Sequence, residues 1–185
     1  MSKRSGEFVT LEDLVAEVGV DAARWFLLSR SHDTTIDLDL DLAREQSGEN
    51  PVYYVQYAHA RIVSVLTRAG SGRVSAALAD VGACAEEDED EGESGALDPA
   101  ERALIKRLLA LPEEVSEAAQ RRAPHRIATY ALELAQDFTA FYRDCRVVGA
   151  EPERVESLRL AVSMAAQRTI ARCLDLLGVG APREM

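Results

Sequence analysis

Apolar side chains recur every three or four residues along most of this chain, which is the spacing of helices with one buried face. Two short helices are expected near the start, at 10–19 and 21–28. Longer helices are expected at 50–70, from 98 onward, at 124–149 and at 153–177. The pattern therefore predicts an all-α protein: an antiparallel helix bundle of about four long helices with shorter N-terminal helices.

Local signals mark the ends of several of these helices. Thr10 and Asp13 have the spacing of a capping box, and Gly19 is expected to end the first helix. Pro112 is expected to kink or divide the helix that begins after Asp98. The expected buried positions of the last helix are Val155, Leu158, Val162, Ala165, Thr169, Cys173 and Leu176.

Two segments lack a clear helical pattern. Residues 36–42 alternate apolar and acidic side chains, which is the pattern of a half-buried strand. Asp is rare in strands and no partner strand is predicted, so we expect an extended linker whose leucines pack on the helices. Residues 71–96 are rich in Gly, Ser and acids, and we expect a connection with a short helical turn at 76–79.

The net charge of −11 argues against a nucleic-acid partner, but its distribution changes that view. Residues 1–60 carry 5 basic and 11 acidic side chains, and residues 61–120 carry 6 and 13. Residues 121–185 carry 10 and 8. Much of the excess negative charge lies in the acidic run at 86–93, which is predicted to be a solvated loop. A mildly basic C-terminal third can therefore face RNA while the acidic loop points away.

The three cysteines, Cys84, Cys145 and Cys173, are odd in number and lack CxxC spacing. Two of them fall on apolar helix positions, so they are interpreted as reduced core thiols. No apolar run approaches the ~18 residues that span a membrane, and Met1 is not followed by a signal peptide. We expect a cytoplasmic protein with no membrane partner.

Residues 51–61, PVYYVQYAHAR, hold three of the chain's five tyrosines. On a helix, Tyr53, Tyr57 and Arg61 follow one another at intervals of four residues and share a face. Aromatic rings and a guanidinium on one face are the groups that hold unstacked RNA bases. The opposite face carries Val52, Val55, His59, Ile62 and Leu66, and is expected to be buried.

Several stretches spread over the whole chain resemble a known family. They are MSKRSG at 1–6, GVDAAR at 19–24, ENPVYYVQYAHAR at 49–61, FYRDCRV at 141–147, and LDLLGV with the terminal APREM at 174–185. The first resembles the KMSKS loop of class I aminoacyl-tRNA synthetases. The tyrosine helix and the C-terminal tail are most similar to those of arginyl-tRNA synthetase.

The resemblance implies a piece of such an enzyme. Residues 1–48 would be the end of the catalytic domain, and residues 49–185 an α-helical anticodon-binding domain. The whole enzyme attaches arginine to tRNA-Arg with ATP and Mg²⁺, but the HIGH motif and most of the catalytic half are absent here. We expect a chain that recognises tRNA-Arg, has no DNA partner, binds no cofactor by itself and needs the missing N-terminal half for catalysis.

The resemblance also suggests roles for individual residues. Lys3 would be catalytic and would contact the ATP phosphates together with Ser2, and no metal site is expected. Tyr57, Tyr142 and Met185 would line the pocket for anticodon bases, next to Tyr53. Arginines that are candidates for contacts with RNA are Arg61, Arg146 and Arg168.

Other interpretations remain open from the sequence. His59 and Tyr54 lie toward the apolar face and can be core residues, and Tyr142 can serve packing alone. Arg168 can belong to a solvated helix face. At the level of function, the alternatives are a helical protein-interaction module without RNA binding, or the equivalent part of another class I synthetase such as the cysteine enzyme.

Overall fold

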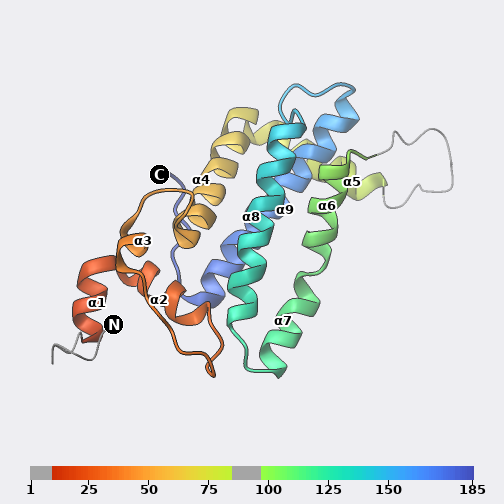
Figure 1. The fold of residues 1–185 in the computed structure, drawn as a ribbon. Helices are drawn as coiled ribbons and strands as arrows, with labels where there is room; N and C mark the ends of the chain where they lie inside the picture. The colour runs from red at the N-terminus through yellow and green to blue at the C-terminus, as the bar shows by residue number, and fades with distance from the viewer. Residues whose placement is uncertain (1–9, 85–96) are drawn as a thin grey trace.

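The computed structural model describes residues 10–84 and 97–185, apart from the side chains of 81–84, and within these ranges the regular structure is entirely helical (Figure 1). The all-α prediction is therefore confirmed. The helices are α1 Leu11–Val18, α2 Val20–Leu28, α3 Leu40–Arg44, α4 Pro51–Ala69, α5 Ser71–Cys84, α6 Pro99–Leu109, α7 Leu111–Gln120, α8 His125–Asp144 and α9 Glu153–Leu177.

Four helices, α4, α6, α8 and α9, form the body of the bundle. Figure 1 shows α9 running antiparallel to both α4 and α8, with α6 antiparallel to α8 on the far side. Helix α7 continues α6 after a break at Ala110, and Pro112 lies in its first turn. Proline fits there because a first-turn N–H has no partner within the helix, so the predicted division is confirmed.

Two buried stripes of side chains, on α8 and α4, supply the centre of the core. On α8, Ile127, Leu134, Phe138 and Phe141 are all buried. The buried face of α4 is as predicted, because its five expected positions from Val52 to Leu66 are shielded from solvent. Contacts with α9 cover both helices, so the core is continuous from α4 to α6.

The N-terminal helices pack on this bundle at the beginning of α4 (Figure 1). The expected capping box starts α1: the Asp13 N–H donates to Thr10 Oγ1 at 3.1 Å, and the Thr10 N–H donates to Asp13 Oδ2 at 3.1 Å. The Thr10 hydroxyl also donates to Asp13 Oδ2 at 2.7 Å, and this bond, together with the one from the Thr10 N–H, lowers the pKa of the Asp13 carboxyl. Trp25 of α2 is 1% exposed and belongs to the same hydrophobic core as α4, α8 and α9.

The structure differs in part from the prediction for the two segments that lack a clear helical pattern. Asp39 is extended, as the linker prediction requires, but its side chain then accepts a hydrogen bond from the Leu42 N–H and starts α3. Residues 71–84 form α5, where we expected a connection with one turn at 76–79. Helix α5 exists because Val74 and Ala77 pack against α9, a contact that local periodicity does not reveal.

Helices α8 and α9 also differ in detail from the prediction. Helix α8 ends at Asp144, five residues before Gly149, because Cys145 is already extended. Helix α9 has the expected ends and buries the expected Val162 and Cys173, but the centre of its buried face is rotated from the predicted one. Leu176, an expected core residue, is 42% exposed, whereas Leu174 and Leu177 are buried. A helix contacted on several sides buries a wide face, and its apolar spacing leaves the phase of that face undetermined.

Cys145 and Cys173 are free, buried thiols, as predicted. Burial raises the pKa of the Cys145 thiol to about 11 and that of Cys173 to about 12, so both are protonated near neutral pH. The side chain of Cys84 lies outside the described residues. Among the helices that the structure describes, none is long and apolar enough to cross a membrane.

Candidate nucleic-acid interface

The outer face of α4 carries a stack of aromatic and cationic side chains. The Tyr53 and Tyr57 rings are nearly parallel, with 12° between their planes and 6.3 Å between their centroids. Arg61 follows one turn later, and its guanidinium donates a hydrogen bond to the Tyr57 hydroxyl at 3.4 Å. The three residues therefore share a face, as their spacing predicted.

Helix α8 adds a second aromatic ring to this stack. The Arg61 Cζ atom lies 4.8 Å from the centroid of the Tyr142 ring and 5.9 Å from that of Tyr57. Tyr142 is backed by the buried Phe138, whose ring centroid is 6.0 Å away. The Arg61 guanidinium is thus held between two tyrosines by cation–π attraction. We call Tyr53, Tyr57, Arg61 and Tyr142 the tyrosine–arginine cluster.

The cluster is open to solvent on one side. Tyr57 is 42% exposed and Arg61 is exposed, while Tyr53 and Tyr142 are half-buried. Exposed ring faces offer stacking surfaces to flat ligands, and the guanidinium offers hydrogen-bond donors to base edges or phosphates. Because the rings are held by each other and by Phe138, the surface is largely formed before a ligand arrives.

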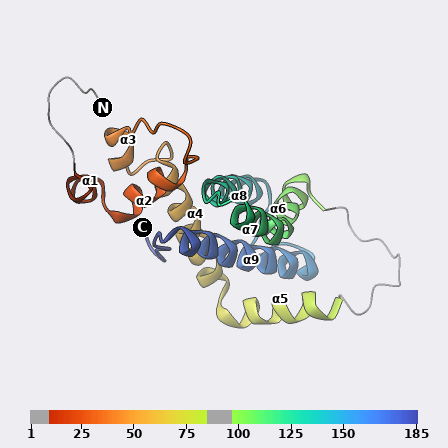
Figure 2. The same ribbon diagram turned by 90° about the horizontal axis from the view of Figure 1, so that it is seen from below.

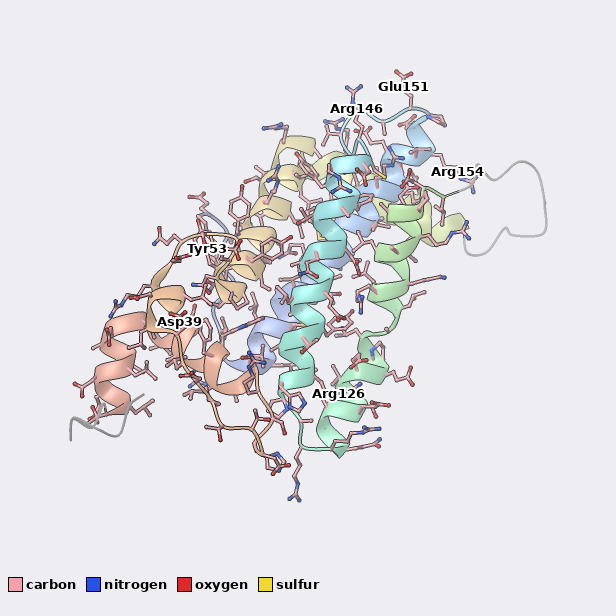
Figure 3. The ribbon with its side chains drawn as sticks, viewed as in Figure 1. Asp39, Tyr53, Arg126, Arg146, Glu151 and Arg154 are labelled. Carbon is pink, nitrogen blue, oxygen red and sulfur yellow. The ribbon has the colours of Figure 1, made fainter. Side chains whose placement is uncertain are left out.

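The other predicted site residues lie apart from the cluster. Arg146 is on the loop between α8 and α9, at the far end of the bundle from Tyr53 (Figure 3), where its Nε donates to the Val148 carbonyl at 3.2 Å. Arg168 is exposed on α9 and lines a groove beside α5. Met185 is 52% exposed at the end of the C-terminal tail, residues 178–185. Ser2 and Lys3 lie outside the described residues.

The C-terminal tail is fastened to α2 and α4 through Gly180. The Gln56 side-chain amide of α4 donates to the Gly180 carbonyl at 2.9 Å and to Asp21 Oδ2 at 2.8 Å. Asp21, on α2, also accepts the Gly180 N–H at 3.2 Å. These contacts join residues far apart in the sequence and fix the tail alongside the helix that carries the tyrosines.

His59 fastens the tail at a second point. Its Nδ1 donates to the Pro182 carbonyl at 2.7 Å, and its Nε2 lies 2.6 Å from the Gln167 amide of α9. A carbonyl can only accept, so Nδ1 carries the proton and Nε2 accepts from the amide. His59 is 2% exposed, which confirms its interpretation as a hydrogen-bonded core residue.

Tyr54, Tyr142 and Arg168 also had alternative interpretations, as core, packing or surface residues. Tyr54 is half-buried, and its hydroxyl donates to Thr139 Oγ1 at 3.0 Å. Tyr142 packs on Phe138 and also contacts Arg61, so it does more than fill space. Arg168 is on an exposed helix face, as the solvated-face interpretation has it, but that face also borders a groove.

Three residues outside the predicted site share the cluster's face of α4 or hold the tail. Arg68 is exposed on α4, seven residues after Arg61 and hence on the same face. That spacing was visible in the sequence and could have identified it. Gln56 and Asp21 had no such signal, because their roles arise from contacts between α2, α4 and the tail. Within the described ranges, no group of three or more His, Cys, Asp or Glu side chains is placed to hold a metal ion.

Comparison with known families shows the family to which this chain belongs. The sequence profile of the DALR anticodon binding domain matches residues 55–185, which include most of α4 and all of α8, α9 and the tail. The chain belongs to the DALR anticodon-binding family. The tyrosine–arginine cluster and the tail of this DALR chain lie mostly inside the matched region.

Several proteins similar to this DALR chain are described as arginine–tRNA ligases or arginyl-tRNA synthetases. It is 45% identical to an arginine–tRNA ligase of Carboxydothermus hydrogenoformans over its full length, and covers 31% of that protein. The Thermus thermophilus arginyl-tRNA synthetase structure superposes on 99% of the chain, with 33% identity, a TM-score of 0.71 and 29% of that protein covered. A Campylobacter jejuni structure, provisionally described as an arginyl-tRNA synthetase, gives a TM-score of 0.81 over the whole chain at 29% identity, with 37% of that protein covered. The chain thus spans about a third of the length of the relatives it matches.

Proposed function

We propose that this chain recognises the anticodon loop of tRNA-Arg, as part of an arginine–tRNA ligase in the cytoplasm. The observation that carries the proposal is the tyrosine–arginine cluster, an open stack on the DALR domain of a chain whose relatives are arginine–tRNA ligases. In this reading residues 1–48 end the catalytic domain and residues 49–185 bind the anticodon. The rest of the enzyme is the other partner.

The geometry suggests how bases would be held. An anticodon base stacks on the exposed Tyr57 ring, while Arg61, fixed by Tyr142, donates to the base edge or to a phosphate. Met185 lies at the end of a tail that runs beside α4 and offers an apolar side chain to a second base. Arg146, at the end of the bundle, would contact the backbone of the RNA.

Replacing Tyr57 or Arg61 with alanine is expected to weaken tRNA-Arg binding by about 10- to 100-fold, because a stacked base is worth ~1–3 kcal/mol. Fluorescence anisotropy with labelled tRNA-Arg at several salt concentrations measures the effect. Tyr57→Phe keeps the ring and should bind nearly as well as the unchanged chain. Arg61→Ala should also flatten the salt dependence of binding if its guanidinium contacts a phosphate.

Two results would favour the alternatives. Equal and salt-insensitive binding by the unchanged chain and both alanine variants would point to a protein-interaction module without RNA binding. Competition with purified tRNAs addresses the other class I synthetases. If tRNA-Cys displaced the labelled tRNA-Arg more effectively than unlabelled tRNA-Arg does, the choice of tRNA-Arg would be wrong.

The isolated chain is expected to have no arginine-activating activity. Lys3 and Ser2 are proposed to contact ATP phosphates in the complete enzyme, with Mg²⁺, but the groups that bind arginine and adenine belong to the absent catalytic half. Arginine-dependent exchange of pyrophosphate into ATP should therefore stay at background. Turnover above background that is lost in Lys3→Ala would show that the chain activates arginine by itself.

A further inference from the structure

A groove separate from the tyrosine–arginine cluster lies where α5 leaves the end of α4. Its walls are α4, α5, α9 and the C-terminal tail, and its volume is about 860 Å³. Figure 2 shows α5 lying alongside α9 and joined directly to α4, which closes one side of this region. The space is large enough for roughly one or two nucleotides.

Half of the residues that line the groove are apolar, and the rest include groups that suit phosphates. Arg168 of α9 and Arg183 of the tail border it, and both are exposed. Ser71 and Ser75 of α5 contribute hydroxyls, and none of the described residues that line the groove is acidic. In a chain of net charge −11, a groove with two cations and no carboxylate attracts a polyanion.

Within the described part of the chain, the two arginines lack the carboxylate partners that Arg159 and Arg172 of α9 have. Arg159 and Arg172 of α9 are bonded to carboxylates of Glu101 and Asp175. Arg168 and Arg183 form no hydrogen bond or ion pair within the described part of the chain. Their guanidiniums are therefore available for bidentate phosphate contacts.

The groove and the tyrosine–arginine cluster lie on different sides of the same helix, α4. Its α4 wall includes Val63 and Thr67, and Val63 lies roughly 120° around the helix from Tyr57, at 100° per residue. Arg183 belongs to the tail that is fastened to α4 at Pro182. A strand that places its bases on the cluster can therefore cross the tail and reach the groove on the adjacent side of the same helix.

We propose that this groove binds phosphates of the RNA backbone next to the bases held at the tyrosine–arginine cluster. The ligand class is a single-stranded polynucleotide, held through Arg168, Arg183 and the two serine hydroxyls. Among the described residues the groove is lined by no Phe, Tyr or Trp, and its one imidazole, that of His59, is only 2% exposed and bonded through both nitrogens. It therefore offers little stacking, and its contribution is independent of base identity. This inference rests on the proposed function, because the same RNA occupies both places.

The test compares salt dependence of tRNA-Arg binding for Arg168→Ala, Arg183→Ala and the double variant. Each lost phosphate contact should reduce the slope of log affinity against log salt by about 0.7, and the double variant should bind about tenfold more weakly at low salt. Preference for tRNA-Arg over other tRNAs should be unchanged. The pair Arg168→Lys and Arg183→Lys keeps the charge and should keep most of the slope.

Arg172→Ala is the matched control. Arg172 is also exposed on α9, is bonded to Asp175 at 2.6 Å and does not line the groove. An equal loss in this control, or an unchanged slope in the double variant, overturns the inference. If Tyr57→Ala weakens binding while the double variant matches the unchanged chain, the groove inference alone fails. If the unchanged chain does not bind tRNA-Arg, the proposed function fails and the groove inference fails with it.

Discussion

Replacing Phe138 with alanine is expected to lower the free energy of unfolding by about 3–5 kcal/mol. Phe138 is 1% exposed at the centre of α8, with its ring 6.0 Å from those of Phe141 and Tyr142. Removal of the ring leaves a cavity in a core that is covered by neighbouring helices and cannot easily collapse. Urea unfolding followed by far-UV circular dichroism measures the loss.

The same substitution should also weaken tRNA-Arg binding, because Phe138 supports the Tyr142 ring against which Arg61 rests. Phe138→Leu keeps most of the volume and should cost less than half as much stability. Leu109→Ala is a surface control, since Leu109 is 75% exposed. A change below about 0.5 kcal/mol for Phe138→Ala, as is usual for a surface site, would contradict the described core.

The buried Trp25 adds a second measurement to that experiment. It is the chain's single tryptophan, and it lies in α2, within the region proposed to end the catalytic domain. Because it shares the core of the bundle, its fluorescence should change at the same urea concentration as the circular dichroism signal. An earlier fluorescence transition would mean that α2 unfolds separately from the bundle.

The second large effect is expected at the ion pair between α6 and α9. Arg159→Met should lower the free energy of unfolding by about 3 kcal/mol. The Arg159 Nε donates to Glu101 Oε1 at 2.6 Å, and its terminal nitrogen donates to the Arg146 carbonyl at 2.8 Å. Glu101 is 5% exposed, so without Arg159 its carboxylate stays buried without a cation.

A double variant separates the two contributions to that loss. Glu101 Oε2 also accepts the Asp98 N–H at 2.7 Å and completes the capping box of α6, a bond that glutamine can still accept through its side-chain oxygen. Glu101→Gln combined with Arg159→Met should therefore be more stable than Arg159→Met alone. If thermal and urea unfolding show that the two losses simply add, the buried unpaired charge is not the cause.

The sequence could predict those contacts of the site that lie within one helix, but not the contacts between helices. Tyr53, Tyr57 and Arg61 could be grouped from their spacing, because residues four apart share a helix face. The contact between Arg61 and Tyr142 joins residues 81 positions apart, and only the resemblance suggested that they belong together. Their roles in RNA binding stay predictions, as do those of Arg146, Arg168 and Met185. The ATP contacts of Ser2 and Lys3 also stay predictions.

The sequence by itself determined the helical class, the ends of most helices and the two faces of α4. These features depend on local spacing, caps and proline, which act over a few residues. The tertiary structure decided the existence of α5, the buried face of α9, the closing of Arg61 between two rings, and the fastening of the tail by Asp21, Gln56 and His59. Each of these depends on packing between segments distant in the chain, and the apolar spacing within one segment does not say which other segment it contacts.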